Sequence, residues 1–171
     1  MSDVDITIRP MREADTDTIL SNFKVQGWTK PRSVLEKYLE GQNKGSLFMF
    51  FAELNNDIAG YAVLYTDAAA GSFAYKKIPL VSDLIVFEKY QRRGIANKIL
   101  DAAEEKAAEF SNRIHLGVGL HSGYGAAQRI YAKRGYIPDG SGVWYKDKPL
   151  EQYADCKNDD DLILYLIKEI L

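Results

Sequence analysis

The sequence has few of the residues from which disulfides and zinc sites are made. It contains one cysteine, Cys156, and two histidines, His115 and His121, among 171 residues. One cysteine cannot form a disulfide within the chain, and the histidines have no cysteine or carboxylate cluster at zinc-ligand spacing. We therefore expect neither a structural disulfide nor a metal ion.

Charge of one sign and long apolar runs are also scarce. Lysine and arginine number 22 and aspartate and glutamate 24, so the formal net charge is −2. Nucleic-acid-binding proteins usually carry a basic face, so this balance argues against a nucleic-acid partner. The N-terminus lacks the basic start and apolar core of a signal peptide, and no apolar run approaches the roughly 18 residues that cross a membrane. These absences predict a soluble cytoplasmic protein with no membrane partner.

Apolar side chains, by contrast, are plentiful. Hydrophobic residues make up 46% of the sequence and aromatic residues 12%, which is enough to offset the entropy of ordering the chain. At roughly 100–200 residues per domain, this length favours one domain. We find no internal repeat and no proline- or serine-rich linker, so residues 1–171 are predicted to form a single domain.

Hydrophobic periodicity predicts a mixed α/β chain. Strands are predicted at residues 4–9, 46–54, 58–65, 80–87, 113–120 and 142–146. Helices, with apolar residues three and four apart, are predicted at residues 13–24, around 34–39, at 95–110 and at 122–134. Gly135 is expected to cap the last of these helices. Residues 162–170 fit either a helix or a strand.

The segment most informative about chemistry joins the fourth predicted strand to the third predicted helix. It reads DLIVFEKYQRRGIANK from residue 83. The first turn of a helix has N–H groups without partners and the positive end of the helix dipole, and Gly94 lets a ligand approach the backbone. Arg92 and Arg93 add positive charge. The pattern predicts a diphosphate site, with a tight turn and solvated arginines as the alternative.

Two motifs in this sequence resemble those of a known family. QRRGIA at residues 91–96 matches the Gln/Arg-x-x-Gly-x-Gly/Ala signature of the GNAT superfamily of acyl-CoA-dependent N-acetyltransferases. GAAQRIYAKRGY at residues 125–136 is similar to the later family motif Ala-x-x-x-Tyr-x-Lys-x-Gly-Phe. Their separation and the order of predicted elements also fit that family from Ile6 to Tyr145, nearly the whole chain.

The resemblance implies a GNAT-like α/β fold. Such a fold has a central, twisted, mostly antiparallel sheet of about six or seven strands, flanked by about four helices and splayed between its fourth and fifth strands. Members usually finish with a strand, so residues 162–170 are expected to form one. Many members are dimers, so the resemblance also allows a homodimer.

The resemblance also implies site residues. The backbone of Leu84, Ile85 and Val86 is expected to bind the pantetheine arm of acetyl-CoA. The pyrophosphate is expected at the following loop and first helical turn, which comprise Gln91, Arg92, Arg93, Gly94, Ile95, Ala96 and Asn97. Tyr131 matches the tyrosine that protonates the departing thiolate in many members. At a position that is often asparagine and contacts the cofactor, this chain has Tyr124, so that contact is not carried over.

The implied reaction is N-acetylation of a primary amine of a small molecule or peptide, by direct attack in a ternary complex. The ammonium group must first lose a proton, usually to a carboxylate. Asp83 is the best-placed carboxylate, because it lies in the middle of the cofactor strand; the alternative is an inward polar residue that fixes a loop. Glu88 is a weaker candidate, and His121 is more readily interpreted as a solvated or capping residue.

Three alternatives stay open. Trp28 is predicted to form a wall of the acceptor site; the alternative is that it only packs against neighbouring residues. Gly117, Gly119 and Ser122 nearly match the dinucleotide fingerprint Gly-x-Gly-x-x-Gly/Ala, although too few residues follow them for a two-half dinucleotide fold. The main alternative function is that of a non-catalytic sensor or scaffold domain of the same fold that binds acyl-CoA.

Overall fold

The computed structural model describes residues 5–171. The strands are β1 (Ile6–Arg9), β2 (Leu47–Leu54), β3 (Asp57–Tyr65), β4 (Leu80–Val86), β5 (Arg113–Gly119), β6 (Ile137–Tyr145), β7 (Lys148–Pro149) and β8 (Leu162–Glu169). The helices are α1 (Asp15–Val25), α2 (Arg32–Asn43), α3 (Ile95–Ala107) and α4 (Gly125–Lys133), with short 3₁₀ turns η1 (Glu88–Tyr90) and η2 (Ser122–Tyr124). Hydrogen bonds order the strands β1-β2-β3-β4-β5-β8-β6-β7.

The chain forms two compact units. The first comprises the described residues up to 65 together with 82–106, and the second comprises 66–81 and 107–171. The two units share β4, whose first two residues belong to the second unit and whose last five belong to the first. The interpretation of residues 1–171 as one domain stays a prediction.

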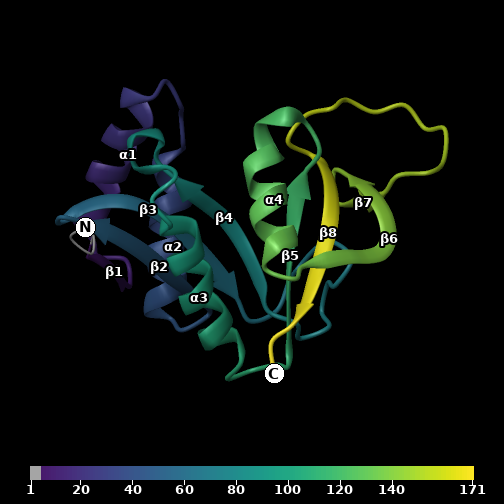
Figure 1. Ribbon diagram of the computed structural model, residues 1–171, viewed down its shortest axis with the longest axis horizontal. Helices are drawn as coiled ribbons and strands as arrows, with labels where there is room; N and C mark the ends of the chain where they lie inside the picture. Colours follow the sequence, from purple (N-terminus) through teal and green to yellow (C-terminus); the bar gives the residue numbers. More distant parts are fainter. Residues whose placement is uncertain (1–4) are drawn as a thin grey trace. The chain divides into compact units, whose positions relative to one another are not determined.

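The first unit contains strands that are covered on both faces. β1, β2 and β3 pair antiparallel. Residues 58–64 of β3 are all buried, as expected for a strand with packed material on either side. Figure 1 shows α3 in front of these strands and α1 and α2 behind them. The core side chains include Ile19, Phe23, Leu35, Phe51, Leu64, Ile99 and Leu100.

The second unit is built on β5 and β8, which pair antiparallel from Arg113 opposite Glu169 to Gly119 opposite Ile163. β6 pairs antiparallel with β8, and β7 with β6. The start of β4 pairs in parallel with β5, Leu80 opposite His115 and Val81 opposite Leu116. The sheet is therefore mostly antiparallel, with a parallel pair at β4 and β5.

These observations confirm the predicted fold class and most elements, with differences at element ends. Residues 162–169 form a strand, as the resemblance implies, and β7 adds a two-residue strand to the six or seven expected. β6 begins at Ile137 instead of residue 142, and Pro138 with two glycines hides its strand pattern in the sequence. The helix expected from residue 122 begins at Gly125, after η2. Val4 of the first predicted strand lies outside the described residues.

The end of α4 confirms the predicted glycine cap. Gly135 has a φ angle of +87°, a value that favours glycine. The Tyr136 N–H donates to the carbonyl of Tyr131 (3.0 Å), and the Gly135 N–H donates to that of Ala132 (3.1 Å). This pair of bonds is the usual way to end a helix on a left-handed residue.

His115 on β5 is a fully buried histidine of the second unit. Its ring packs against Phe73, with centroids 4.7 Å apart, and near Tyr165, at 6.4 Å. Neither ring nitrogen has a hydrogen-bond partner among residues 5–171. Burial disfavours the charged ring and lowers the pKa of His115 to about 4. The ring is therefore neutral in the folded protein at neutral pH.

We expect acid to destabilise the fold through His115. In the unfolded chain the histidine pKa is about 6.5, so the stability that the neutral ring contributes is complete above that pH. It is lost as the pH falls toward the folded-state value, by about 2 kcal/mol between pH 7 and pH 5. Urea titrations at both pH values measure this loss, which should shrink by that amount in His115→Leu and persist in His121→Gln. An unchanged pH dependence in His115→Leu would refute the expectation.

Candidate functional site

The loop between β4 and α3 is anchored within the first unit. The Phe87 N–H donates to the carbonyl of Ala59 on β3 (2.9 Å). The hydroxyl of the buried Tyr90 donates to the Asp57 carboxylate (2.9 Å). These bonds fix the chain just before η1 and at its last residue, so residues 91–94 enter α3 along a defined path.

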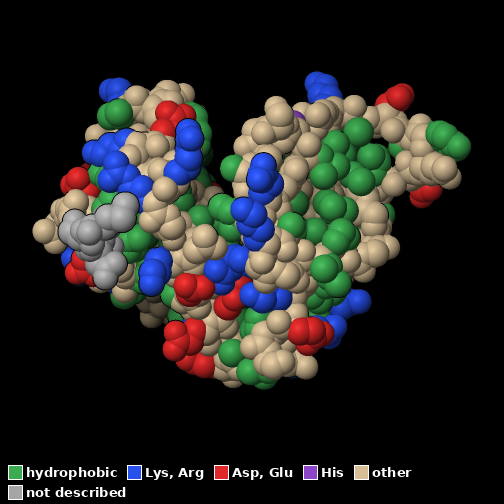
Figure 2. All heavy atoms as spheres, viewed as in Figure 1, with side chains coloured by type: hydrophobic (Ala, Val, Ile, Leu, Met, Phe, Trp, Pro, Cys, Tyr) green, Lys and Arg blue, Asp and Glu red, His purple; other side chains and the backbone are tan. Residues whose placement is uncertain are grey.

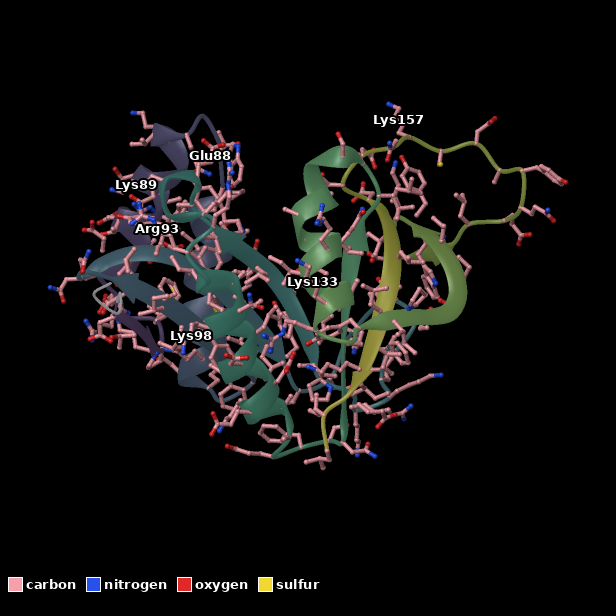
Figure 3. The ribbon with its side chains drawn as sticks, viewed as in Figure 1. Glu88, Lys89, Arg93, Lys98, Lys133 and Lys157 are labelled. Atoms are coloured by element: carbon pink, nitrogen blue, oxygen red, sulfur yellow. The ribbon has the colours of Figure 1, made fainter. Side chains whose placement is uncertain are left out.

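The start of α3 leaves open space where the sequence predicts a diphosphate. Gly94 has a φ angle of +80°, and apart from its chain neighbours no atom of the described chain lies within 4 Å of a β-carbon built there. Arg92 has a φ angle of +60°, and it and Arg93 are exposed. Figure 3 shows Lys89 on η1, Arg93 just before α3 and Lys98 on α3. Figure 2 shows basic side chains on this surface of the first unit. The backbone N–H groups at the start of α3, the positive end of the helix dipole and the arginine side chains together fit a diphosphate.

The other predicted residues of this loop have different environments. Ile95 is buried in the core, so it has only its backbone to offer a ligand, and Ala96 is half-buried. The Gln91 side chain is exposed and donates to the Val86 carbonyl (3.2 Å). Asn97 is exposed on the first turn of α3. A ligand here therefore meets mostly backbone and the arginine side chains.

β4 is irregular next to the residues predicted to bind pantetheine. Asp83 has a φ angle of +50°, a left-handed value inside a strand. Residues 84–86 follow it and are half-buried. On β3, a β-carbon at Gly60 would lie 2.4 Å from the carbonyl oxygen of Ile85. Gly60 therefore permits the close approach of β3 and β4, as a glycine inside a strand often does. This glycine was not identified from the sequence.

Asp83 is the centre of a polar cluster assembled from four elements. The Lys30 ammonium, from the loop between α1 and α2, forms an ion pair with its carboxylate. The hydroxyls of Tyr38 on α2 and Tyr61 on β3 donate to the same oxygen, Oδ2, at 3.1 and 3.0 Å. Lys30 Nζ also donates to the Tyr61 hydroxyl (2.8 Å). Asp83 was identified from the sequence, whereas Lys30 and the two tyrosines that bind its carboxylate were not.

The phenols of this cluster stay neutral. Burial, followed by the nearby Asp83 carboxylate, raises the pKa of Tyr38, Tyr61 and Tyr65 above the ordinary tyrosine value. Tyr61 is fully buried and stacks on Phe51 with centroids 5.4 Å apart. The cluster therefore consists of one carboxylate, one ammonium and neutral hydroxyl donors. Glu88, the weaker carboxylate candidate, is exposed on η1 (Figure 3).

Trp28 lies in the same loop as Lys30. The residue is 42% exposed, and its ring is tilted against that of Phe23, with centroids 6.2 Å apart. The backbone N–H of Trp28 donates to the Phe23 carbonyl (2.9 Å), which closes the turn after α1. Trp28 thus contacts Phe23 and stays partly accessible to solvent.

Tyr131 belongs to α4 of the second unit. Its side chain is buried and meets the Tyr136 ring edge-on, with centroids 5.9 Å apart. Burial raises the pKa of Tyr131 to about 12. The hydroxyl is therefore protonated at any pH near neutrality and can act as a proton donor.

Tyr124 and His121 attach the loop before β8 to the start of α4. The Tyr124 hydroxyl donates to Asp160 Oδ1 (3.0 Å), and His121 Nε2 lies 2.9 Å from the same oxygen. His121 Nδ1 accepts from the Gly123 N–H (3.1 Å) and caps η2, which confirms the capping interpretation. These bonds, the His121 contact foremost, lower the pKa of Asp160.

The glycines that nearly match the dinucleotide fingerprint have packing roles. A β-carbon at Gly119 would lie 2.3 Å from the Tyr124 ring. One at Gly117 would lie 2.8 Å from a methyl carbon of Ile163 on β8. Both positions need glycine for contacts within the second unit, so the fingerprint requires no nucleotide to explain it.

The chain belongs to the GNAT acetyltransferase family. Residues 18–146 match the acetyltransferase (GNAT) domain. A relative from Lactobacillus delbrueckii subsp. lactis, described as an uncharacterized N-acetyltransferase in the pepI 3′ region, is 28% identical over 129 residues, or 72% of this chain and 73% of the relative. The family uses acetyl-CoA and an acceptor, and membership supports acyl-CoA-dependent acetyl transfer in general.

Solved structures of this family have the same fold. An acetyltransferase of the GNAT family from Desulfovibrio desulfuricans is 14% identical with a TM-score of 0.72, over 98% of this chain and 100% of that one. An acetyltransferase from Salmonella typhimurium, solved with its cofactor acetyl-CoA, is 18% identical with a TM-score of 0.68, over 97% and 94% of the two chains. The ribosomal-protein-alanine N-acetyltransferase from Brucella melitensis is 18% identical with a TM-score of 0.68, over 95% and 99%.

The described residues contain neither a metal-ligand cluster nor a membrane-spanning helix. Among residues 5–171, no group of three or more histidine, cysteine, aspartate or glutamate side chains is placed to hold a metal ion. Within the same residues, no helix is both long enough and apolar enough to span a bilayer.

Proposed function

We propose that this protein transfers the acetyl group of acetyl-CoA to a primary amine of a small molecule or peptide, by direct attack while both substrates are bound. The observation that carries the proposal is the open, positively charged start of α3 at Gly94. A short loop containing η1 joins it to an irregular strand, β4, with a carboxylate at its centre. When bound, acetyl-CoA supplies an acetyl group activated as a thioester.

In this proposal each predicted residue has one task. The backbone of residues 84–86 holds the pantetheine arm, and the N–H groups of residues 92–97 hold the diphosphate, with Gln91 beside them. Asp83 accepts the proton that the acceptor ammonium must lose before it can attack. Tyr131 supplies a proton to the departing sulfur, and its hydroxyl is protonated at neutral pH, as a proton donor must be. Trp28 forms a wall of the acceptor site.

Other parts of the proposal rest on the resemblance and the composition. We infer that the chain is one catalytic domain, that it works in the cytoplasm, where acetyl-CoA is available, and that a homodimer is compatible with its activity. Size-exclusion chromatography with light scattering tests the dimer directly.

A thiol-release assay tests the function. The protein is incubated with acetyl-CoA and a panel of amines that spans polyamines, aminoglycosides, amino acids and peptides. Release of coenzyme A thiol that depends on both the protein and one class of amine supports the proposal. Binding of acetyl-CoA with no thiol release across the panel would instead favour a sensor or scaffold domain.

We expect coenzyme A to stabilise the wild type and to leave Gly94→Val unaffected. A ligand that binds only the native state adds about 2.7 kcal/mol at a hundredfold excess over Kd, which raises the melting temperature by several degrees. A branched side chain at Gly94 fills the space that the diphosphate needs. Gly135→Val is the matched control, because Gly135 has a similar φ angle of +87° and equally open surroundings at the end of α4.

The two glycine variants should lose similar stability from backbone strain, and the Gly135 variant should keep the ligand-induced shift. Differential scanning fluorimetry with millimolar coenzyme A measures both effects. A full shift in Gly94→Val, or none in the wild type, would remove the basis of the diphosphate site.

A further inference from the structure

The cluster around Asp83 contains a primary amine of the protein itself. Lys30 Nζ pairs with the Asp83 carboxylate and donates to the Tyr61 hydroxyl. It also lies 5.5 Å from the centre of the Phe23 ring and 5.4 Å from that of Tyr61. The Lys30 side chain is 14% exposed and the Asp83 side chain 18%. The lysine is thus held by charge, hydrogen bonding and ring faces, while the cluster keeps some access to solvent.

This arrangement combines the two groups that N-acetylation requires. An ammonium group must lose a proton before its nitrogen can attack an acyl carbon, and here the carboxylate that would take the proton is already hydrogen-bonded to the ammonium. Asp83 directly precedes the β4 residues 84–86 that we propose hold the pantetheine arm. A reactive amine fixed beside its base loses little entropy on reaching the reacting geometry.

We propose that Lys30 is a self-acetylation site of this protein. The inference rests on the proposed acetyl-CoA-dependent function and adds a specific acceptor within the chain. The Lys30 ammonium gives one proton to Asp83, and its nitrogen forms an amide bond with the acetyl carbon as the carbon–sulfur bond breaks. The sulfur takes up a proton, so the products are acetyl-Lys30 and coenzyme A thiol.

Acetylation changes the cluster in a defined way. The amide of acetyl-Lys30 carries no charge and keeps one N–H donor. Once Asp83 has passed the proton it accepted to solvent, its carboxylate has no counter-ion from Lys30 and keeps the hydroxyls of Tyr38 and Tyr61 as donors. The modification therefore alters the charge beside the residue that we propose as the proton acceptor.

Peptide mass spectrometry of the wild-type protein after incubation with acetyl-CoA tests the inference. Pro31 follows Lys30 and blocks trypsin, so chymotrypsin is used; cleavage after Trp28 and Tyr38 gives residues 29–38. This fragment also contains Lys37, which is exposed on α2 and serves as an internal control. We expect at least about tenfold more acetylation at Lys30 than at Lys37, because only Lys30 is held at a base.

Three further measurements sharpen the test. The rate of Lys30 acetylation should be independent of protein concentration, since the reaction occurs within one molecule. Asp83→Asn should lower acetylation at Lys30 and leave Lys37 unchanged. Lys24→Arg, an exposed substitution at the end of α1, should leave Lys30 acetylation at the wild-type level.

The outcomes separate this inference from the proposed function. Equal labelling of Lys30 and Lys37 indicates simple chemical acetylation and overturns the inference. An unmodified Lys30 in a protein that releases thiol with added amines overturns the inference and leaves the proposed function standing. An unmodified Lys30 together with no thiol release from any amine contradicts both.

Discussion

A Tyr131→Phe variant should fold normally, bind acetyl-CoA with near-normal affinity and turn over about tenfold to a hundredfold more slowly than the wild type. The substitution removes the hydroxyl and keeps the buried ring and its contact with Tyr136. Negative charge builds on sulfur as the thioester breaks, and a protonated phenol can donate to it. Proton transfer by a side chain contributes roughly 10²–10⁴-fold; a thiol leaves more easily than most groups, so we expect an effect at or below the lower end of that range.

Steady-state thiol release at saturating amine measures this effect. Tyr136→Phe is the matched control, because it removes a hydroxyl from the other ring of the same buried pair. That control should keep wild-type turnover. Since the pKa of Tyr131 is raised to about 12, the hydroxyl keeps its proton below about pH 11, so deprotonation of Tyr131 should not limit the wild-type rate there. Full turnover in Tyr131→Phe would reduce the residue to a packing role.

Asp83→Asn should have the second large effect, on both turnover and stability. Without the carboxylate, turnover should fall most at neutral pH and less at high pH, where amines with a pKa near 10 are increasingly deprotonated. The largely buried Lys30 ammonium also loses its counter-ion. We expect the free energy of unfolding to fall by about 1–3 kcal/mol, with acetyl-CoA affinity nearly unchanged. Turnover at several pH values and urea titrations measure the two effects.

A double variant separates the chemical role of Asp83 from its structural one. Lys30→Met keeps an unbranched apolar chain and removes the charge, so Lys30→Met combined with Asp83→Asn leaves no unpaired ion in the cluster. The double variant should recover most of the lost stability, because the pair is removed as a whole. Turnover should stay low if Asp83 accepts the proton. Recovery of turnover along with stability would show that Asp83 only neutralises Lys30.

The start of α3 was predictable because its signals are local. The glycine, the two arginines and the strand–loop–helix order lie within a dozen consecutive residues, and backbone groups do most of the binding that we propose. Helix and strand patterns repeat every few residues, so β2, β3 and α3 were also found close to their observed bounds. β6 was recognised only at its end, because Pro138 and the glycines interrupt its alternation and its register shifts there.

The cluster around Asp83 could not be predicted in the same way. Lys30, Tyr38, Tyr61 and Asp83 come from a loop, a helix and two strands, and no spacing in the sequence links them. Tyr38 continues an apolar helical stripe and Tyr61 lies in an apolar strand, so both are typical of core residues. Only the pairing register of β3 and the packing of α2 bring their hydroxyls to one carboxylate oxygen.

The left-handed backbone at Asp83 restricts which substitutions can accumulate there during evolution. A strand residue with a φ angle of +50° is tolerated best by glycine, asparagine and aspartate. Glycine and asparagine lack the carboxylate that pairs with Lys30, and glutamate keeps the charge but moves it by one methylene and suits the backbone less well. Aspartate alone meets both requirements. The residue at this position is therefore a useful criterion for sorting relatives that share this site from those that share only the fold.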